Sequence, residues 1–179
     1  MSDVLIGKGK VSGMAFRAPR NTSLPAYPSE ALSADYVNIG AISEDGIELE
    51  FPSGDVIRNW ALVAERKANT ENGKVTVRFL YTNQKTLETL VGAGNVTHTA
   101  ASAVHGNVDT VEFAPDVSAD PCAFVFLIKD GDKLALVGST DALITSISNV
   151  SFTPDSAVIW EAVIEGTWTF MVDDGQVTS

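Results

Sequence analysis

Cysteine is almost absent from this sequence, with a single residue, Cys122, in 179. One cysteine cannot form a disulfide within the chain, so a disulfide-stapled monomer is excluded. Cys122 begins the apolar run CAFVFLI. We therefore expect it to be a small buried hydrophobic residue rather than a reactive thiol.

Long hydrophobic runs are also missing. No apolar stretch approaches the roughly 20 residues that a helix needs to cross a bilayer. The opening sequence MSDVLIGKGK lacks the charged, apolar and small-residue regions of a secretory signal peptide. We therefore expect no membrane partner and a protein that is made and folded in a cytoplasm.

Basic residues are scarce, with 12 Lys and Arg against 23 Asp and Glu and a formal net charge of −11. The imbalance is uneven, because Lys8, Lys10, Arg17 and Arg20 lie near the N-terminus and acids dominate after Ala100. Phosphate contacts need Lys and Arg, so tight nucleic-acid binding is disfavoured. Two interpretations stay open: an acidic surface that keeps the protein soluble, or a basic arm that contacts the acidic body of a neighbouring copy.

Residue patterns of catalytic, metal and cofactor sites are lacking too. The two histidines, His98 and His105, do not share the tight ligand spacing that a zinc site needs. No Walker loop, dinucleotide fingerprint or GxSxG motif is present. Asp130-Gly131-Asp132 lacks the continuing carboxylates of a calcium loop, and we interpret it as a hairpin turn. We expect no enzyme activity, no cofactor and no metal.

Alternation of apolar and polar residues predicts β-strands along most of the chain. In GIELEF, Ile47 and Leu49 alternate with Glu48 and Glu50, which places the two carboxylates on one face. KVTVRFLYT alternates in the same way. The SEDG segment indicates a hairpin turn before GIELEF, and residues 122–139 predict a second hairpin around DGD.

One segment, NQKTLETLVG, changes to a helical period. Leu87, Leu90 and Val91 fall at positions i, i+3 and i+4. Asn83 suits the N-cap and Gly92 suits the position after the last helical turn. The pattern predicts a helix of about two turns, the one substantial helix of the chain.

These elements predict a mainly β fold, an antiparallel β-sandwich or partly closed barrel flanked by one short α-helix. Residues 1–35 contain Gly, Pro and Ser without a steady period, and we expect an extended N-terminal arm there. The folded domain is then residues 36–175, with a short tail at 176–179. Strands at the edges of such a sheet invite pairing with another copy.

The order of these features resembles the major tail tube proteins of long, non-contractile-tailed (siphovirus-like) bacteriophages. The resemblance is carried by IGAISEDGIELEF, then DVIRNW, then KVTVRFLYTNQKTLETLVGAGNV, and by the closing NVSFTPDSAVIWEAVIEGTWTFMVDDG. It covers roughly residues 35–175, and the ordered set of motifs is more specific than any one of them.

The resemblance implies a structural virion protein of the phage tail, assembled in the host bacterial cytoplasm. It implies rings, of six subunits, whose sheets join into one lumen barrel, and stacking through an N-terminal arm and a long loop. The implied partners are further copies of the chain and the tape measure, terminator and distal tail proteins. It also implies a negatively charged lumen through which DNA passes without specific binding.

On this interpretation Glu48 and Glu50 are the candidate lumen-facing acids. Lys8, Lys10, Arg17 and Arg20 are the candidate residues of a ring-stacking arm. One alternative is another ring-forming tail or neck protein, such as a tail terminator. A second is a carbohydrate-binding surface module built on the three tryptophans, although tryptophans on alternating strands are more often core or interface anchors.

Overall fold

The computed structural model describes residues 12–50, 56–58, 64–66, 72–80, 83–111, 119–130, 132–148 and 159–174. Their elements follow the chain as β1 (Ser12–Pro19), β2 (Val37–Glu50), β3 (Val56–Arg58), β4 (Ala64–Arg66), β5 (Gly73–Phe79), α1 (Gln84–Val91), a 3₁₀ turn (Ala93–Asn95), β6 (Val96–Thr99), β7 (Val108–Val111), β8 (Cys122–Asp130), β9 (Lys133–Ile147), β10 (Trp160–Gly166) and β11 (Thr169–Asp173). None of the helices in these ranges is long and apolar enough to cross a membrane.

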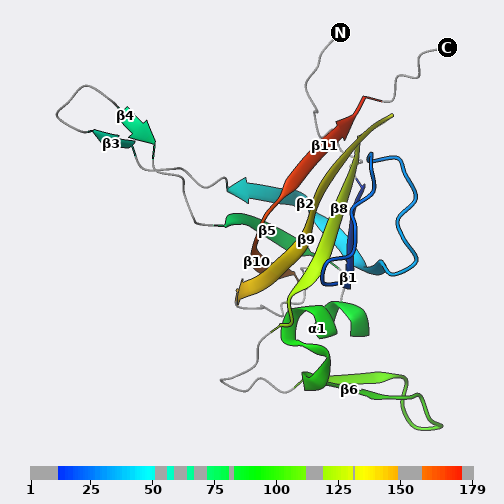
Figure 1. Ribbon diagram of the computed structural model, residues 1–179. Helices are drawn as coiled ribbons and strands as arrows, with labels where there is room; N and C mark the ends of the chain where they lie inside the picture. The colour runs from blue at the N-terminus through cyan, green and yellow to red at the C-terminus, as the bar shows by residue number, and fades with distance from the viewer. Residues whose placement is uncertain are drawn as a thin grey trace.

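Six antiparallel strands form a closed barrel in the order β10-β5-β2-β1-β8-β9, which the pairing of β9 with β10 completes. The predicted fold class is therefore confirmed. Outside the barrel, β3 pairs with β4 and β6 pairs with β7 in two small ladders. In Figure 1 the β3–β4 ladder lies well to one side of the barrel, and β6 lies beside α1.

Strand β9 is long enough to pair with two strands along one of its edges. Its residues 134–138 pair with β11, and its residues 142–147 pair with β10. Its other edge pairs with β8, as the predicted hairpin over residues 122–139 requires. Only the β10 pairing closes the barrel, so β11 extends the sheet beyond the closed part, at the end opposite α1 (Figure 1).

The barrel interior holds the main core. Strand β5 alternates as predicted, since Val75, Val77 and Phe79 are fully buried and the residues between them are not. Phe124 and Phe126 of β8 add two stacked rings with centroids 6.1 Å apart. Burial of side chains of this size contributes about 1.5–3 kcal/mol each, so this core is the main source of stability.

Helix α1 closes one end of the barrel and confirms the helix prediction (Figure 1). Asn83 caps it, because its side-chain oxygen accepts a hydrogen bond from the Thr86 backbone amide at 2.9 Å. Leu87, Leu90 and Val91 form the buried stripe and pack into the barrel core. The Thr86 hydroxyl donates to the Ile39 carbonyl at 2.5 Å and ties the helix to β2.

The segment expected to be an arm is largely part of the folded domain, which corrects its boundary at residue 35. Strand β1 lies between β2 and β8, with Ala15 fully buried. Residues 20–36 cover the outer face of this wall, where Tyr36 and Leu24 pack in a second small core. The inward positions of β1 hold Gly13, Ala15, Arg17 and Pro19, none of them a large apolar residue, so no hydrophobic period shows in the sequence. Residues 1–11 lie outside the described residues.

The hairpin predicted at SEDG is wrong. Ile42 and Ile47 both pair with β5, opposite Phe79 and Val77, so residues 43–46 form an irregularity within the single strand β2. Gly46 has φ of 75°, as a tight turn would need, but the chain resumes its direction after it. The parts of β2 before and after residues 43–46 both turn apolar side chains toward the barrel core, and both pair with β5.

Gly166, at the end of β10, tests how closely β10 packs against β9 where the barrel closes. A Cβ there would lie 2.6 Å from the Ala142 Cβ and 2.8 Å from the Asp141 carbonyl oxygen. We expect Gly166→Ala to lower the free energy of unfolding by about 1–3 kcal/mol, measured by urea denaturation. Gly94→Ala is the matched control, because no atom lies within 4 Å of its added Cβ. Equal stabilities for the two variants would contradict close packing at the seam.

Candidate assembly surfaces

Four neighbouring barrel strands, β2, β5, β10 and β9, present a charged outer face. We call it the charged sheet face and define it by six residues: Glu48, Glu50, Lys74, Arg78, Glu161 and Glu165. The register aligns Glu50, Lys74 and Glu165 in one row and pairs Arg78 with Glu161 in another. Four glutamates against one lysine and one arginine give this face a net charge of −2.

Glu48 and Glu50 lie on the solvent side of β2, as their alternation predicts. Both are exposed, whereas Ile47 and Leu49 on the opposite side pack against the barrel core. The other glutamates of the face are engaged within the chain. Lys74 Nζ lies 3.8 Å from a Glu165 carboxylate oxygen, and Arg78 Nε donates to Glu161 at 2.5 Å. In the described part of the chain, Glu48 and Glu50 are the acids of this face without an ion pair.

The same four strands leave two sheet edges open. On β2, pairing with β1 reaches Ile42, and the edge of residues 46–50 on that side has no strand partner in the described ranges. On β9, pairing with β8 reaches Ala142, and the edge of residues 143–147 likewise has none there. Unpaired N–H and C=O groups on such edges are templates for another strand.

Strand β11 presents a further edge, because no strand pairs with its side away from β9 in the part of the chain that the structure describes. Its side chains alternate, with Met171 in the outer small core. Phe170 and Val172 face the other way and are 54% and 49% exposed. Large apolar side chains exposed side by side commonly mark an interaction surface.

The two described arginines of the predicted stacking arm, Arg17 and Arg20, each form an ion pair with an acid of the same subunit. Arg17 Nη2 lies 3.3 Å from Glu88 of α1, and Arg20 makes two hydrogen bonds to Asp141 of β9 at 2.8 and 2.7 Å. The partners are 71 and 121 residues away in sequence, so the sequence pattern cannot reveal them. Lys8 and Lys10 lie outside the described residues.

Glu88 gathers several donors at the junction of helix and barrel. It is 8% exposed and accepts hydrogen bonds from Lys85 at 2.8 Å and Gln84 at 2.9 Å in addition to Arg17. A carboxylate this buried is tolerated only when it is paired, and three donors meet that need. Arg17 is therefore a structural residue that fixes α1 on the barrel end.

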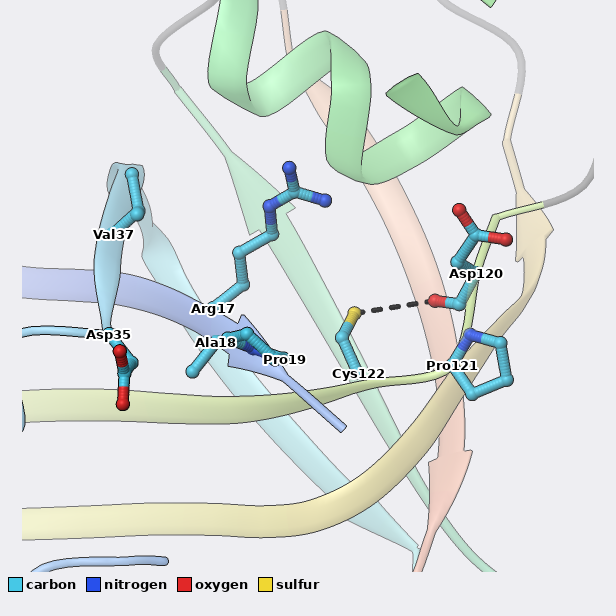
Figure 2. A pocket seen from close by; sticks show the side chains of 8 residues that line it. All are labelled: Arg17, Ala18, Pro19, Asp35, Val37, Asp120, Pro121 and Cys122. Atoms are coloured by element: carbon cyan, nitrogen blue, oxygen red, sulfur yellow. Dashed lines mark hydrogen bonds between the residues drawn. The ribbon is translucent and has the colours of Figure 1, made fainter. Parts of the chain in front are cut away.

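A cavity of about 360 Å³ opens beside Arg17 and is lined in part by Asp35, Val37, Asp120 and Cys122 (Figure 2). The Cys122 thiol donates to the Asp120 carbonyl at 3.3 Å. Burial raises the pKa of this thiol to about 11, and Arg17 lowers it by less. The thiol is protonated near neutral pH, as the sequence interpretation of a buried, unreactive cysteine predicts. This cavity offers no activated nucleophile.

Neither histidine belongs to a metal site in the described ranges, where no group of three or more His, Cys, Asp and Glu side chains comes together. His98 Nδ1 lies 2.6 Å from Asp109 Oδ1 across the β6–β7 ladder. His105 Nδ1 contacts the carbonyl of Gly106. Both histidines are exposed, and their contacts are those of a surface hairpin.

The chain matches no protein-family model, and no curated protein shows significant similarity to it.

Native Cys122 should react slowly with thiol reagents. A pKa of about 11 instead of the ordinary 9.0 leaves roughly 100-fold less thiolate at about pH 8, and burial adds a steric barrier. We expect rapid modification by an aromatic disulfide reagent only after unfolding in urea, followed by absorbance. Fast modification of one thiol in the native protein would show that the cavity admits reagents and that Cys122 is ionised there.

Proposed function

We propose that this chain is a structural protein that assembles through its sheet edges into rings, and that the rings stack into a tube of the phage tail tube kind. One observation carries the proposal. Four adjacent barrel strands end, on both sides, in edges that no strand completes in the described ranges. An edge at each end of one wall allows each copy to pair with two neighbours.

The strand directions fit such a ring. Neighbours in the order β2-β5-β10-β9 are all antiparallel, so β2 and β9 run in opposite directions. When copies are related by rotation about a ring axis along the strands, β9 of one copy lies antiparallel to β2 of the next. The antiparallel alternation then continues without a break, and closure of the ring removes both open edges.

In this ring the charged sheet face lines the passage. Glu48 and Glu50 add the two carboxylates that no ion pair offsets in the described part of the chain. A wall of net charge −2 per subunit repels phosphate, so DNA passes without being held. The candidate lumen role of both glutamates fits their exposure on the solvent side of β2.

Stacking of rings is proposed to use the basic residues near the N-terminus. Arg17 and Arg20 are engaged within the subunit, which leaves Lys8 and Lys10 as the basic candidates near the N-terminus. Their proposed partners are acidic surfaces of the next ring. A virion tail location, six-fold rings and contacts with other tail proteins belong to the same proposal and are supported by the sequence resemblance alone.

The carbohydrate-binding alternative loses support from the tryptophans that the structure describes. Trp160 is 6% exposed, and Trp168 packs against the barrel core and stacks on Phe126 with centroids 5.9 Å apart. They are core anchors, as the sequence analysis favoured, and they do not form an exposed platform. The tail terminator alternative would use the same edges but give single rings.

Negative-stain electron microscopy of the purified protein, with light scattering alongside, tests the proposal. Hollow tubes of stacked rings are the expected result. Single closed rings without stacks would favour a terminator or neck protein. Monomers at every protein concentration and salt condition, also after addition of preformed rings or other tail components, would contradict assembly through the edges.

Charge substitutions at Leu143 test which edges meet. Leu143 is 37% exposed on the β9 edge, on the same outer face as the glutamates of the neighbouring β2 edge in the proposed ring. We expect Leu143→Glu to reduce the assembled fraction, most strongly at low salt, because like charges then meet across the interface. Light scattering and electron microscopy measure that fraction.

The matched control is Leu143→Lys, which has a similar size and solvent cost but the opposite charge. It should assemble at least as well as the unsubstituted chain at low salt, since glutamates surround the new ammonium group. Equal assembly of the Glu and Lys variants at low salt would show that the β9 edge does not lie beside Glu48 and Glu50.

A further inference from the structure

We infer that the N-terminal segment, residues 1–11, docks on β11 of its own chain, with Val4, Leu5 and Ile6 against the exposed side chains of Phe170 and Val172. Docking of this kind is that of the free folded subunit, before Lys8 and Lys10 contact the next ring under the proposed function. The occupant is a part of this chain, and the site is a strand that the barrel leaves uncovered.

The site is the face of β11 that continues the barrel interior. Phe170 pairs with Val137 and Val172 with Ala135, and side chains of directly paired residues share one face of a sheet. Val137 belongs to the interior core, so Phe170 and Val172 extend that apolar surface beyond the closed barrel. They are about half exposed, while Val137 and Ala135 beside them are buried. The described chain thus leaves the apolar surface of β11 half covered.

The start of β1 places the N-terminal segment within reach. Ser12 pairs with Lys129, Lys129 with Leu134, and Leu134 with Asp173, so Ser12 and Asp173 lie in one row across four adjacent strands. Three strand spacings separate them, about 14 Å. Residues 7–11 extended cover about 17 Å, enough to cross this distance. Val4, Leu5 and Ile6 then arrive at the level of Val172 and Phe170.

The composition of the segment fits this path. Gly7 and Gly9 alternate with Lys8 and Lys10 in the stretch that would make the crossing, and Val4, Leu5 and Ile6, the only apolar triplet of residues 1–11, stand before it in the sequence. The rim that the crossing follows is acidic. Asp130 and Asp132 flank the β8–β9 turn, and Asp173 and Asp174 end β11, against Lys129 and Lys133. Charge complementarity and an apolar match therefore favour the same route.

Paramagnetic broadening in nuclear magnetic resonance tests this docking. A nitroxide is attached at Ser2→Cys, which leaves the apolar triplet intact, in a ¹⁵N-labelled chain diluted until light scattering shows monomers. We expect loss of the amide signals of β11, with those of β6 and β7 unchanged. The matched control label is at Val104→Cys, 90% exposed in the β6–β7 connection at the α1 end of the molecule (Figure 1). It should leave the β11 signals intact.

Two further samples make the result decisive. Leu5→Asp in the Ser2→Cys chain should restore the β11 signals, because a carboxylate does not transfer to an apolar site; persistent broadening would overturn the apolar contact. A mixture of spin-labelled chains without ¹⁵N and ¹⁵N chains without label should show no broadening. Broadening in that mixture would assign the site to a second copy and overturn docking within one chain, as would intact β11 signals in the first sample.

Discussion

The pairing of β9 with β10 is the interaction on which the rest of the structure depends. It converts an open antiparallel sheet into a barrel, and it succeeds because β9 continues past the end of β8. The chain then passes Gly166, where the Ala142 side chain lies too close for any larger residue, and β11 continues in the same direction along the same edge of β9. In the described ranges this geometry leaves one edge open on β9 and one on β11.

The sequence predicted correctly those elements that show a local pattern of apolar and polar residues. The alternation of KVTVRF gives β5 with its buried Val75, Val77 and Phe79, and the Asn83 cap with the Leu87, Leu90 and Val91 stripe gives α1. Sequence-based prediction failed for β1, because the inward residues of this strand, Gly13, Ala15, Arg17 and Pro19, include no large apolar side chain and give no apolar period. It failed at SEDG, because a turn signal cannot tell a hairpin from a bulge whose two arms pair with the same strand.

The candidate assembly surfaces could be predicted only in part from the sequence. Exposure of Glu48 and Glu50 follows from a period of two, but the lysine and arginine that share their face come from β5. Which strand edges stay open depends on the order of strands in the sheet. That order is set by pairing between distant segments, which a single sequence does not show. The same holds for Arg17 and Arg20, whose basic character suggested an arm. Glu88 and Asp141 hold them because the fold brings distant segments together.

Charge decides which of the open edges pair under the ring proposal. Two β2 edges meeting each other would set Glu48 and Glu50 against the same residues of the other copy, and like charges directly opposite are destabilising. Two β9 edges meeting would avoid that cost but leave both β2 edges unpaired. Pairing of β2 with β9 avoids the repulsion and completes both edges at once. Because the β2 edge of one copy would pair with the β9 edge of the next, every added copy leaves one edge of each kind open until the ring closes.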